Sequence, residues 1–305
     1  MEKQEIHRLL SLPLPELIAE ADAVRRESVP PRVELCNILN AKSGRCGEDC
    51  KFCAQSGRHS SGIDSYPLKE RQEIIAAALK AKKMGAERFD IVTSGDRLSK
   101  DELRLIVDCV REITLNLKIK MCASLGSMTE GELLLLKNAG LTRYHHNIET
   151  SERFFPNIVS THSFQDRINT IKAAKKVGLE VCSGGIIGMG ETMEDRLDMA
   201  FILKQLGVDS VPINILVARP GTPLESLKPL SPEEVIRTVA IFRIILKDKI
   251  IKLAAGRESI LKDSQVLAFM AGANGMLIGG YLTIRGRSIE EDRKLVAEIE
   301  KSWQT

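Results

Sequence analysis

Apolar residues along this 305-residue chain gather in short runs that return at regular intervals. Each run has the length of a strand, and a longer stretch follows in which apolar positions recur at the period of a helix that buries one face. The predicted strands lie near residues 32–38, 87–93, 118–123, 142–148, 179–184, 209–216, 250–255 and 275–280. The predicted helices lie near 68–84, 99–115, 129–139, 163–177, 192–206, 231–247, 258–271 and 288–302, and one more precedes them near 14–27.

Eight consecutive strand–helix units predict an α/β fold, a (β/α)8 barrel of the TIM type. A doubly wound sheet is the alternative. The barrel is favoured because polar and cysteine residues interrupt the apolar strands, and strands covered by helices can direct such residues only to a shared interior or its mouth. These residues are Cys36, Asp90, Cys122, Asn147, Cys182 and Asn214. We expect an N-terminal helical extension over residues 1–30 and the barrel over 31–305.

Charge and composition point to a small-molecule partner. The chain has 44 basic and 41 acidic residues and few aromatic ones, with no basic block, which argues against nucleic-acid and membrane-surface binding. No apolar run is long enough to span a bilayer, and the N-terminus lacks the order of a signal peptide. A cytoplasmic location is therefore expected, where the seven cysteines would be metal ligands or core residues rather than disulfides.

Cys46, Cys50 and Cys53 form a Cys-x3-Cys-x2-Cys triad in the loop after the first predicted strand. Three thiolates hold a 4Fe-4S cluster and leave one iron open to bind and reduce a small molecule. This spacing is typical of radical S-adenosylmethionine (SAM) enzymes, which usually carry an aromatic residue against the adenine where this chain has Phe52. A structural zinc site is the alternative, but it needs a fourth ligand, for which His59 is the nearest candidate.

Six motifs carry a closer resemblance. They are residues 42–56, 144–151, 181–192, 211–216, 255–258 and 269–274, and they follow one another in the same order over nearly the whole chain. Together they resemble the biotin synthases. The departure of residues 92–96 from the familiar pattern keeps other radical SAM enzymes open, such as a hydrogenase maturase or a methylornithine synthase. A zinc-bearing binding protein is the alternative from another class.

The resemblance implies a homodimeric enzyme that cleaves SAM with an electron from a flavodoxin- or ferredoxin-type donor. The resulting 5′-deoxyadenosyl radical abstracts hydrogen from dethiobiotin, and sulfur then closes the ring of biotin. By position, Glu149 would hold the SAM ribose, Asn147 and Asn214 would contact substrate or nucleoside, and Arg167 would meet the SAM carboxylate. The glycine-rich run 184–190, with Gly188, would let bare backbone approach the nucleoside.

An auxiliary Fe-S cluster, either 2Fe-2S or larger, is the sulfur source in the family. Cys122, Cys182 and Arg257 match three of its familiar ligands, but Asp90 stands where the second strand should carry a cysteine. A carboxylate is a harder ligand for iron than a thiolate. Cys36, on the neighbouring first strand, would point a replacement thiolate into the same interior. We therefore expect Cys36, Cys122 and Cys182 to bind this cluster, completed or bordered by Arg257 or Asp90.

Three further expectations concern the rest of the site. Thr283 and Arg285 follow the eighth strand and are candidates for binding the substrate carboxylate. His145 and His146 are adjacent and face opposite sides of a strand, so one of them would face the SAM pocket. Cys109 falls on the apolar face of a predicted helix and is expected to pack in the core.

Overall fold

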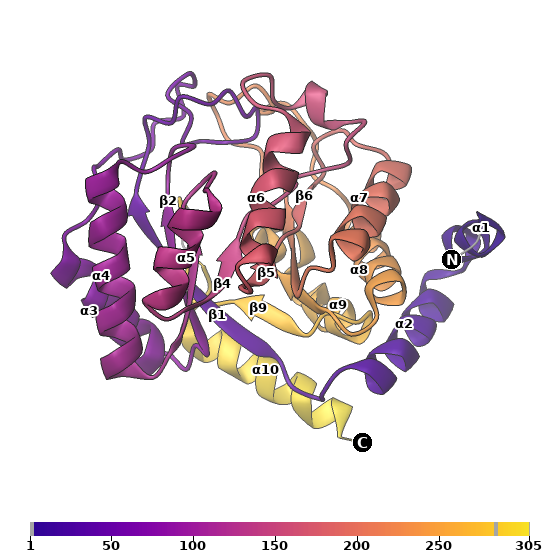
Figure 1. Cartoon of the computed structure of the whole chain (residues 1–305). Helices are drawn as coiled ribbons and strands as arrows, with labels where there is room; N and C mark the ends of the chain where they lie inside the picture. The colour runs from indigo at the N-terminus through magenta and orange to yellow at the C-terminus, as the bar shows by residue number, and fades with distance from the viewer. Residues whose placement is uncertain (1–2, 284–285, 305) are drawn as a thin grey trace.

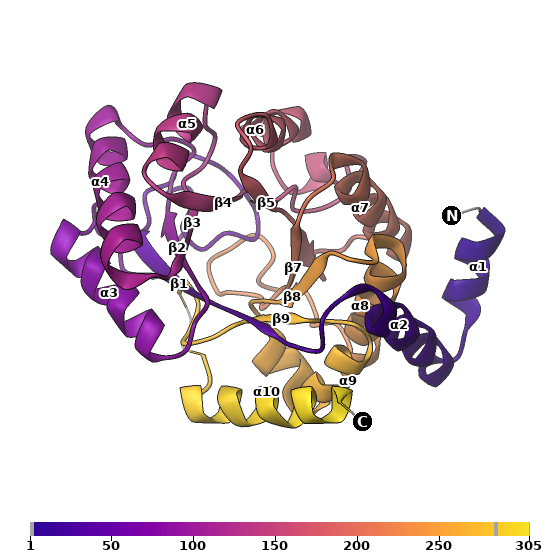
Figure 2. The ribbon, with the colours of Figure 1, turned by 60° about the horizontal axis from the view of Figure 1, so that its bottom comes forward.

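A closed parallel barrel forms the centre of the molecule in the computed structural model, which describes residues 3–283 and 286–304 (Figures 1 and 2). Its strands are β1 (Glu34–Lys42), β2 (Arg88–Thr93), β3 (Lys120–Ser124), β4 (Leu141–His145), β5 (Glu180–Cys182), β6 (Gly185–Ile187), β7 (Ser210–Ile215), β8 (Ile250–Leu253) and β9 (Gly275–Leu277). They pair in the order β5-β4-β3-β2-β1-β9-β8-β7-β6, and a pairing of β5 with β7 closes the ring. Because β5 and β6 are two parts of one barrel strand, the eight predicted strands and the barrel are confirmed.

The break between β5 and β6 falls at Ser183 and Gly184. A Cβ atom on Gly184 would lie 2.0 Å from the carbonyl oxygen of Pro212, and one on Gly185 would lie 2.2 Å from the carbonyl oxygen of Glu149. Both glycines therefore allow neighbouring backbones to come together, which is a packing role.

Helices surround the barrel on all sides in Figure 2. They are α3 (Arg71–Lys83), α4 (Lys100–Leu117), α5 (Glu130–Asn138), α6 (Phe164–Lys176), α7 (Met193–Leu206), α8 (Pro232–Leu246), α9 (Gln265–Met270) and α10 (Ile289–Trp303). Reciprocal capping boxes start most of them, such as Ser99 with Glu102 at α4 and Thr192 with Asp195 at α7. These caps fix where each loop ends and each helix begins.

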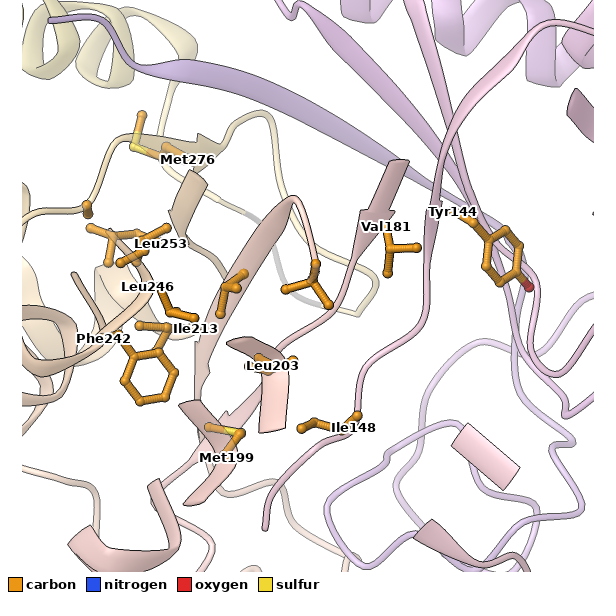
Figure 3. Close-up of a cluster of buried hydrophobic side chains, with 14 of the residues drawn as sticks. Tyr144, Ile148, Val181, Met199, Leu203, Ile213, Phe242, Leu246, Leu253 and Met276 are labelled. Atoms are coloured by element: carbon orange, nitrogen blue, oxygen red, sulfur yellow. The ribbon is translucent and has the colours of Figure 1, made fainter. Parts of the chain in front are cut away.

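The hydrophobic core lies between the strands and the helices (Figure 3). Ile213 on β7 and Leu253 on β8 turn outward toward Leu203 on α7 and Phe242 on α8, and all four side chains are almost fully buried. Cys109 is fully buried on α4 within this core, which confirms its predicted packing role. The outer faces of the strands are thus apolar, which leaves the polar positions for the interior.

One predicted helix is wrong in form. Residues 258–271 do not make a continuous helix but a π-helical turn η2 (Arg257–Leu261), a 3-10 turn η3 (Lys262–Ser264) and the short α9. The chain changes direction at Lys262, which has a φ of 47°, a left-handed conformation that a continuous helix does not contain. The helical spacing of apolar residues in this segment therefore indicates which residues are buried, but it does not indicate a single continuous helix.

Two helices precede the barrel, α1 (Lys3–Ser11) and α2 (Leu14–Ser28). The second matches the predicted helix and packs against α8 and α9 (Figure 2). Its Arg25 guanidinium lies 4.2 Å from the ring centre of Trp303 at the end of α10, a cation–π contact. None of the helices in the described residues has the length and apolar character of a membrane-spanning segment.

Candidate active site

A cavity of about 410 Å³ opens at the carboxyl ends of the barrel strands, where barrels build their sites. The three thiols of the loop triad line it, and so do the thiols of Cys36, Cys122 and Cys182 from the barrel interior. Six of the seven cysteines therefore face one space.

The loop after β1 carries Cys46, Cys50 and Cys53, and it crosses the upper end of the barrel in Figure 1. Hydrogen bonds hold it in place: the Cys53 amide donates to the Cys50 carbonyl at 2.9 Å, and Asp49 accepts the Ser160 amide, also at 2.9 Å. Burial raises the pKa of the Cys50 thiol, and it raises the pKa of the Cys53 thiol to about 11. The backbone thus fixes the loop before any ligand binds.

Asn147, Glu149 and Arg167 lie together on one wall of the cavity. The Arg167 guanidinium donates to the Asn147 carbonyl at 3.1 Å and lies 3.6 Å from the Glu149 carboxylate. Glu149 has a φ of 67°, which is strained for a residue with a side chain and directs its carboxylate beside Asn147. Phe52 lines the same cavity.

The interior thiols differ in their electrostatic surroundings. Burial raises the pKa of Cys36 to about 12. Burial acts the same way on Cys182, but the adjacent imidazole of His145, with Lys252 and Arg143, lowers the net pKa of this thiol to about 7. Burial lowers the pKa of His145, yet Cys182 and Asp90 raise it to about 9 overall. Cys182 is therefore the interior thiol most ready to act as a thiolate.

Asp90 on β2 faces the cavity. Its register partner is Cys122 on β3 and, on the other side, Ile38 on β1. Its carboxyl is buried, which raises its pKa to about 6, and its Oδ1 atom has no hydrogen-bond partner among the described residues. A buried polar atom without a partner is costly. The Asp90 Oδ1 atom could thus accept a hydrogen bond from a bound ligand or coordinate a metal atom.

A buried charge cluster closes the floor of the cavity. The Glu34 carboxylate lies 2.8 Å from Arg88, 2.7 Å from Arg143 and 3.4 Å from Lys252. Burial opposes the charge of Glu34, but the three cations lower its pKa below the ordinary value. Sequence reasoning missed this cluster, although Lys252 in the apolar run of β8 was a signal of the same kind as Cys122 and Asp90.

Arg257 does not reach the cavity, and this corrects the expectation that it borders the auxiliary cluster. Its guanidinium makes a bidentate ion pair with Asp292 at 2.8 and 2.9 Å and also donates to Gln265. It lies just beyond the end of β8, in η2, whereas Lys252 lies within β8 and lines the cavity. The cation that this part of the chain offers to the cavity is therefore Lys252.

Of four other residues predicted for the site, two line the cavity, one does not, and one is not described by the structure. Thr283 lines the cavity, and so does Asn214, whose amide bonds the backbone of Gly185 and Ala255. Gly188 does not line it, because this glycine lies in the turn after β6 and its N–H donates to Glu191. Arg285 lies outside the described residues.

The donor set of the loop fits an iron–sulfur cluster. Cys46, Cys50 and Cys53 all line the cavity. A cluster spreads its thiolate ligands over several irons, and an all-thiol triad beside a cavity matches that arrangement.

Comparison with known proteins identifies the family. The Radical SAM superfamily matches residues 41–203, and the Biotin and Thiamin Synthesis associated domain matches residues 212–300. The biotin synthase of Thermotoga neapolitana is 54% identical over 271 residues, covering 88% of this chain and 97% of that protein. The biotin synthase of Thermotoga petrophila is 50% identical over 293 residues, covering 96% and 97%. The chain belongs to the biotin synthase family. The predicted resemblance, enzyme class and function are thereby confirmed: it is a radical SAM enzyme, a sulfurtransferase.

Solved structures agree on the fold. Methylornithine synthase superposes with a TM-score of 0.85 at 22% identity, covering 99% of this chain and 92% of that one. The FeFe-hydrogenase maturase HydG superposes with a TM-score of 0.80 at 17% identity, covering 95% and 69%. At these identities the likeness concerns the barrel alone. The two enzymes that remained alternatives at the level of sequence thus share the scaffold of a biotin synthase family member.

Proposed function

We propose that this chain converts dethiobiotin to biotin by radical sulfur insertion. The observation that supports the proposal is the single cavity shared by the three loop thiols and the three interior thiols. When bound, a 4Fe-4S cluster with one open iron supplies the electron that cleaves SAM to methionine and a 5′-deoxyadenosyl radical, and an auxiliary Fe-S cluster supplies sulfur. The chain's own residues hold these groups and the two substrates.

Cys46, Cys50 and Cys53 hold the SAM-cleaving cluster in this proposal. Glu149 and Asn147 bind the hydroxyl groups of the SAM ribose, since carboxylate and amide oxygens accept such hydrogen bonds. Phe52 packs against the adenine. Arg167 orients the Glu149 carboxylate through the contact of 3.6 Å, so we assign it to positioning as well as to the SAM carboxylate.

Cys36, Cys122 and Cys182 hold the auxiliary cluster, and Asp90 and Lys252 border it. The three thiols come from β1, β3 and β5, and all point inward at the depth of the charged floor. A cluster with sulfide and thiolate ligands is anionic, and the cations Arg143 and Lys252, which line the same cavity, would offset its charge. Cys36 on β1 restores the cysteine that β2 lacks at Asp90, because these two strands are paired.

The ligand role of Cys36 is tested by its removal. Cys36→Ala should lower iron and acid-labile sulfide after anaerobic reconstitution by the share of the auxiliary cluster, while 5′-deoxyadenosine formation with dithionite continues. Cys109→Ala is the matched control, because it removes a buried thiol on α4 that lies away from the cavity. Iron and sulfide at the wild-type level in Cys36→Ala would show that this thiol binds no cluster.

The activity itself is tested by mass spectrometry. Reconstituted protein with SAM, dithionite and dethiobiotin should form biotin and 5′-deoxyadenosine. A mutase of the methylornithine type needs no second cluster, so iron equivalent to one cluster and no biotin would favour that reaction. Protein that binds zinc and forms no 5′-deoxyadenosine would favour a binding role.

The remaining partners follow from the family. We infer a flavodoxin- or ferredoxin-type electron donor, a homodimer and a cytoplasmic location, where the thiols stay reduced. Size-exclusion chromatography with light scattering tests the dimer, and reduction by purified flavodoxin in place of dithionite tests the donor.

A further inference from the structure

A second hollow of about 450 Å³ adjoins the mouth of the main cavity. Asn40 at the end of β1, the loop after β7 and the segment after β9 form its walls, together with part of the loop that follows β1. Arg219, Tyr281, Leu282 and Thr283 line both spaces. A molecule bound in the main cavity can therefore extend into this hollow between these four residues.

Arg219 is unlike the other arginine and lysine side chains that line the main cavity. Arg143 and Lys252 are paired with Glu34, and Arg167 is paired with Glu149. Arg219 forms no ion pair with any described residue, and its Nε atom is buried without a hydrogen-bond partner. Asp64, an acidic residue of the hollow, is exposed and does not pair with it. The hollow thus offers a positive charge that no residue in the described part of the chain neutralises.

The loop holds Arg219 in place without using its guanidinium. The Thr222 hydroxyl donates to the Arg219 carbonyl at 2.7 Å. Gly221, with a φ of 77°, lies so close to the loop after β1 that an added Cβ would be 2.2 Å from the Ser60 carbonyl oxygen. The Ser60 amide also donates to the Gly221 carbonyl at 3.3 Å. This backbone is fixed by its neighbours, so binding a ligand would not require ordering it first.

The hollow lies on the side of the barrel away from the SAM residues. Asn147 and Glu149 follow β4, and Arg167 is on α6, whereas the hollow is bounded by the ends of β1, β7 and β9. In the barrel order, β9 and β1 are separated from β4 by β2 and β3 on one side and by β8, β7 and β5 on the other. A tail that extends from the main cavity away from the SAM residues would thus pass Arg219, which lines both spaces.

We propose that Arg219 binds the carboxylate of the dethiobiotin tail in this hollow, next to the Thr283 hydroxyl. The inference rests on the proposed function. The carboxylate is the one charged group of dethiobiotin, and a planar guanidinium matches its two oxygens. Arg219 acts as a specificity-determining residue, because it would bind a tail that ends in a charged carboxylate more tightly than an uncharged one. It takes no part in the radical chemistry.

The test compares Arg219→Gln and Arg219→Lys with wild type. The control is Arg97→Gln, which removes an exposed arginine near the mouth that lines neither space. For Arg219→Gln we expect the KM for dethiobiotin to rise about 10- to 100-fold, the loss of one charge-assisted contact. The lysine variant should recover part of the loss, and the control should match wild type.

Two further readouts separate this role from others. The KM for SAM in 5′-deoxyadenosine formation should stay at the wild-type value, and the uncharged methyl ester of dethiobiotin should be used equally by wild type and Arg219→Gln. An unchanged KM for dethiobiotin, or a rise in the KM for SAM instead, would overturn the assignment. Wild-type protein that cleaves SAM yet neither binds nor converts dethiobiotin would overturn the proposed function itself, a result visible without any variant.

Discussion

Replacing Glu34 by glutamine removes the one carboxylate that is shared by three buried cations. Glu34 lies 2.8 Å from Arg88, 2.7 Å from Arg143 and 3.4 Å from Lys252, and each of the three cationic side chains is 3% exposed. Glutamine has nearly the same shape, so the change removes charge with little loss of packing. What remains is a group of three buried cations, of which, among the described residues, only Arg88 and Arg143 keep a carboxylate in direct contact, the half-exposed Glu180.

The expected loss is large for a single substitution. Breaking a buried ion pair by removing one partner costs about 3–5 kcal/mol. With an unfolding entropy of roughly 2.1 cal/mol/K per residue, a chain of 305 residues would lose about 5–8 °C in Tm. Glu180→Gln is the internal control, because Glu180 contacts Arg88 and Arg143 at 2.8 and 2.9 Å but is 44% exposed. Its loss should stay below about 1 kcal/mol.

The assay is thermal unfolding of the cluster-free, reduced protein at pH 7, followed by circular dichroism. The reasoning requires Glu34→Gln to melt well below Glu180→Gln. Equal Tm values for the two variants would refute it, since they would mean that burial of the shared carboxylate does not decide its contribution.

Two further substitutions test the helices around the barrel. Asp195→Asn should cost about 1–2 kcal/mol at pH 7, because the Asp195 carboxylate caps α7 through Thr192 and accepts the Ser151 hydroxyl at 2.7 Å. Burial opposes its charge, but the bonds from Thr192 and Ser151 lower its pKa. Its contribution is thus present above the unfolded pKa of about 3.9 and is lost as the pH falls through the folded value, so urea unfolding should show the variant and wild type converging below about pH 4. Leu203→Ala, at a fully buried position of α7, should cost about 2–5 kcal/mol in the same assay, whereas Leu134→Ala, 47% exposed, should cost less than about 0.5 kcal/mol. Similar losses for the two leucine variants, or a difference for Asp195→Asn that persists at low pH, would contradict these assignments.

The sequence predicted the barrel because its signal is local. Each strand and helix shows its own period, and the eight units follow one another without interruption, so only their closure into a ring had to be inferred. The prediction failed for residues 258–271, where apolar positions recur with a helical period although the chain turns at Lys262. Periodicity reports which side of a segment is buried, and a segment can bury one side without being one helix.

Motif spacing and the family pattern also selected residues that line the cavity, the loop triad and the wall of Asn147, Glu149 and Arg167. The assignment of Arg257 was different. Arg257 and Lys252 are five residues apart, and the sequence offers both as cations at the end of one strand. Only the ion pair between η2 and α10 shows that Arg257 binds Asp292, while Lys252 lines the cavity.

By itself, the sequence determined the family, the barrel and the chemistry of the loop thiols, because these depend on residue types at fixed spacing along the chain. The tertiary structure decided which charges meet. Glu34 joins Arg88, Arg143 and Lys252 from four strands, and Arg219, beside the second hollow, forms no ion pair with the residues that the structure describes. Electrostatic interactions depend on distance and burial in space, and neither can be read from positions so far apart in the chain.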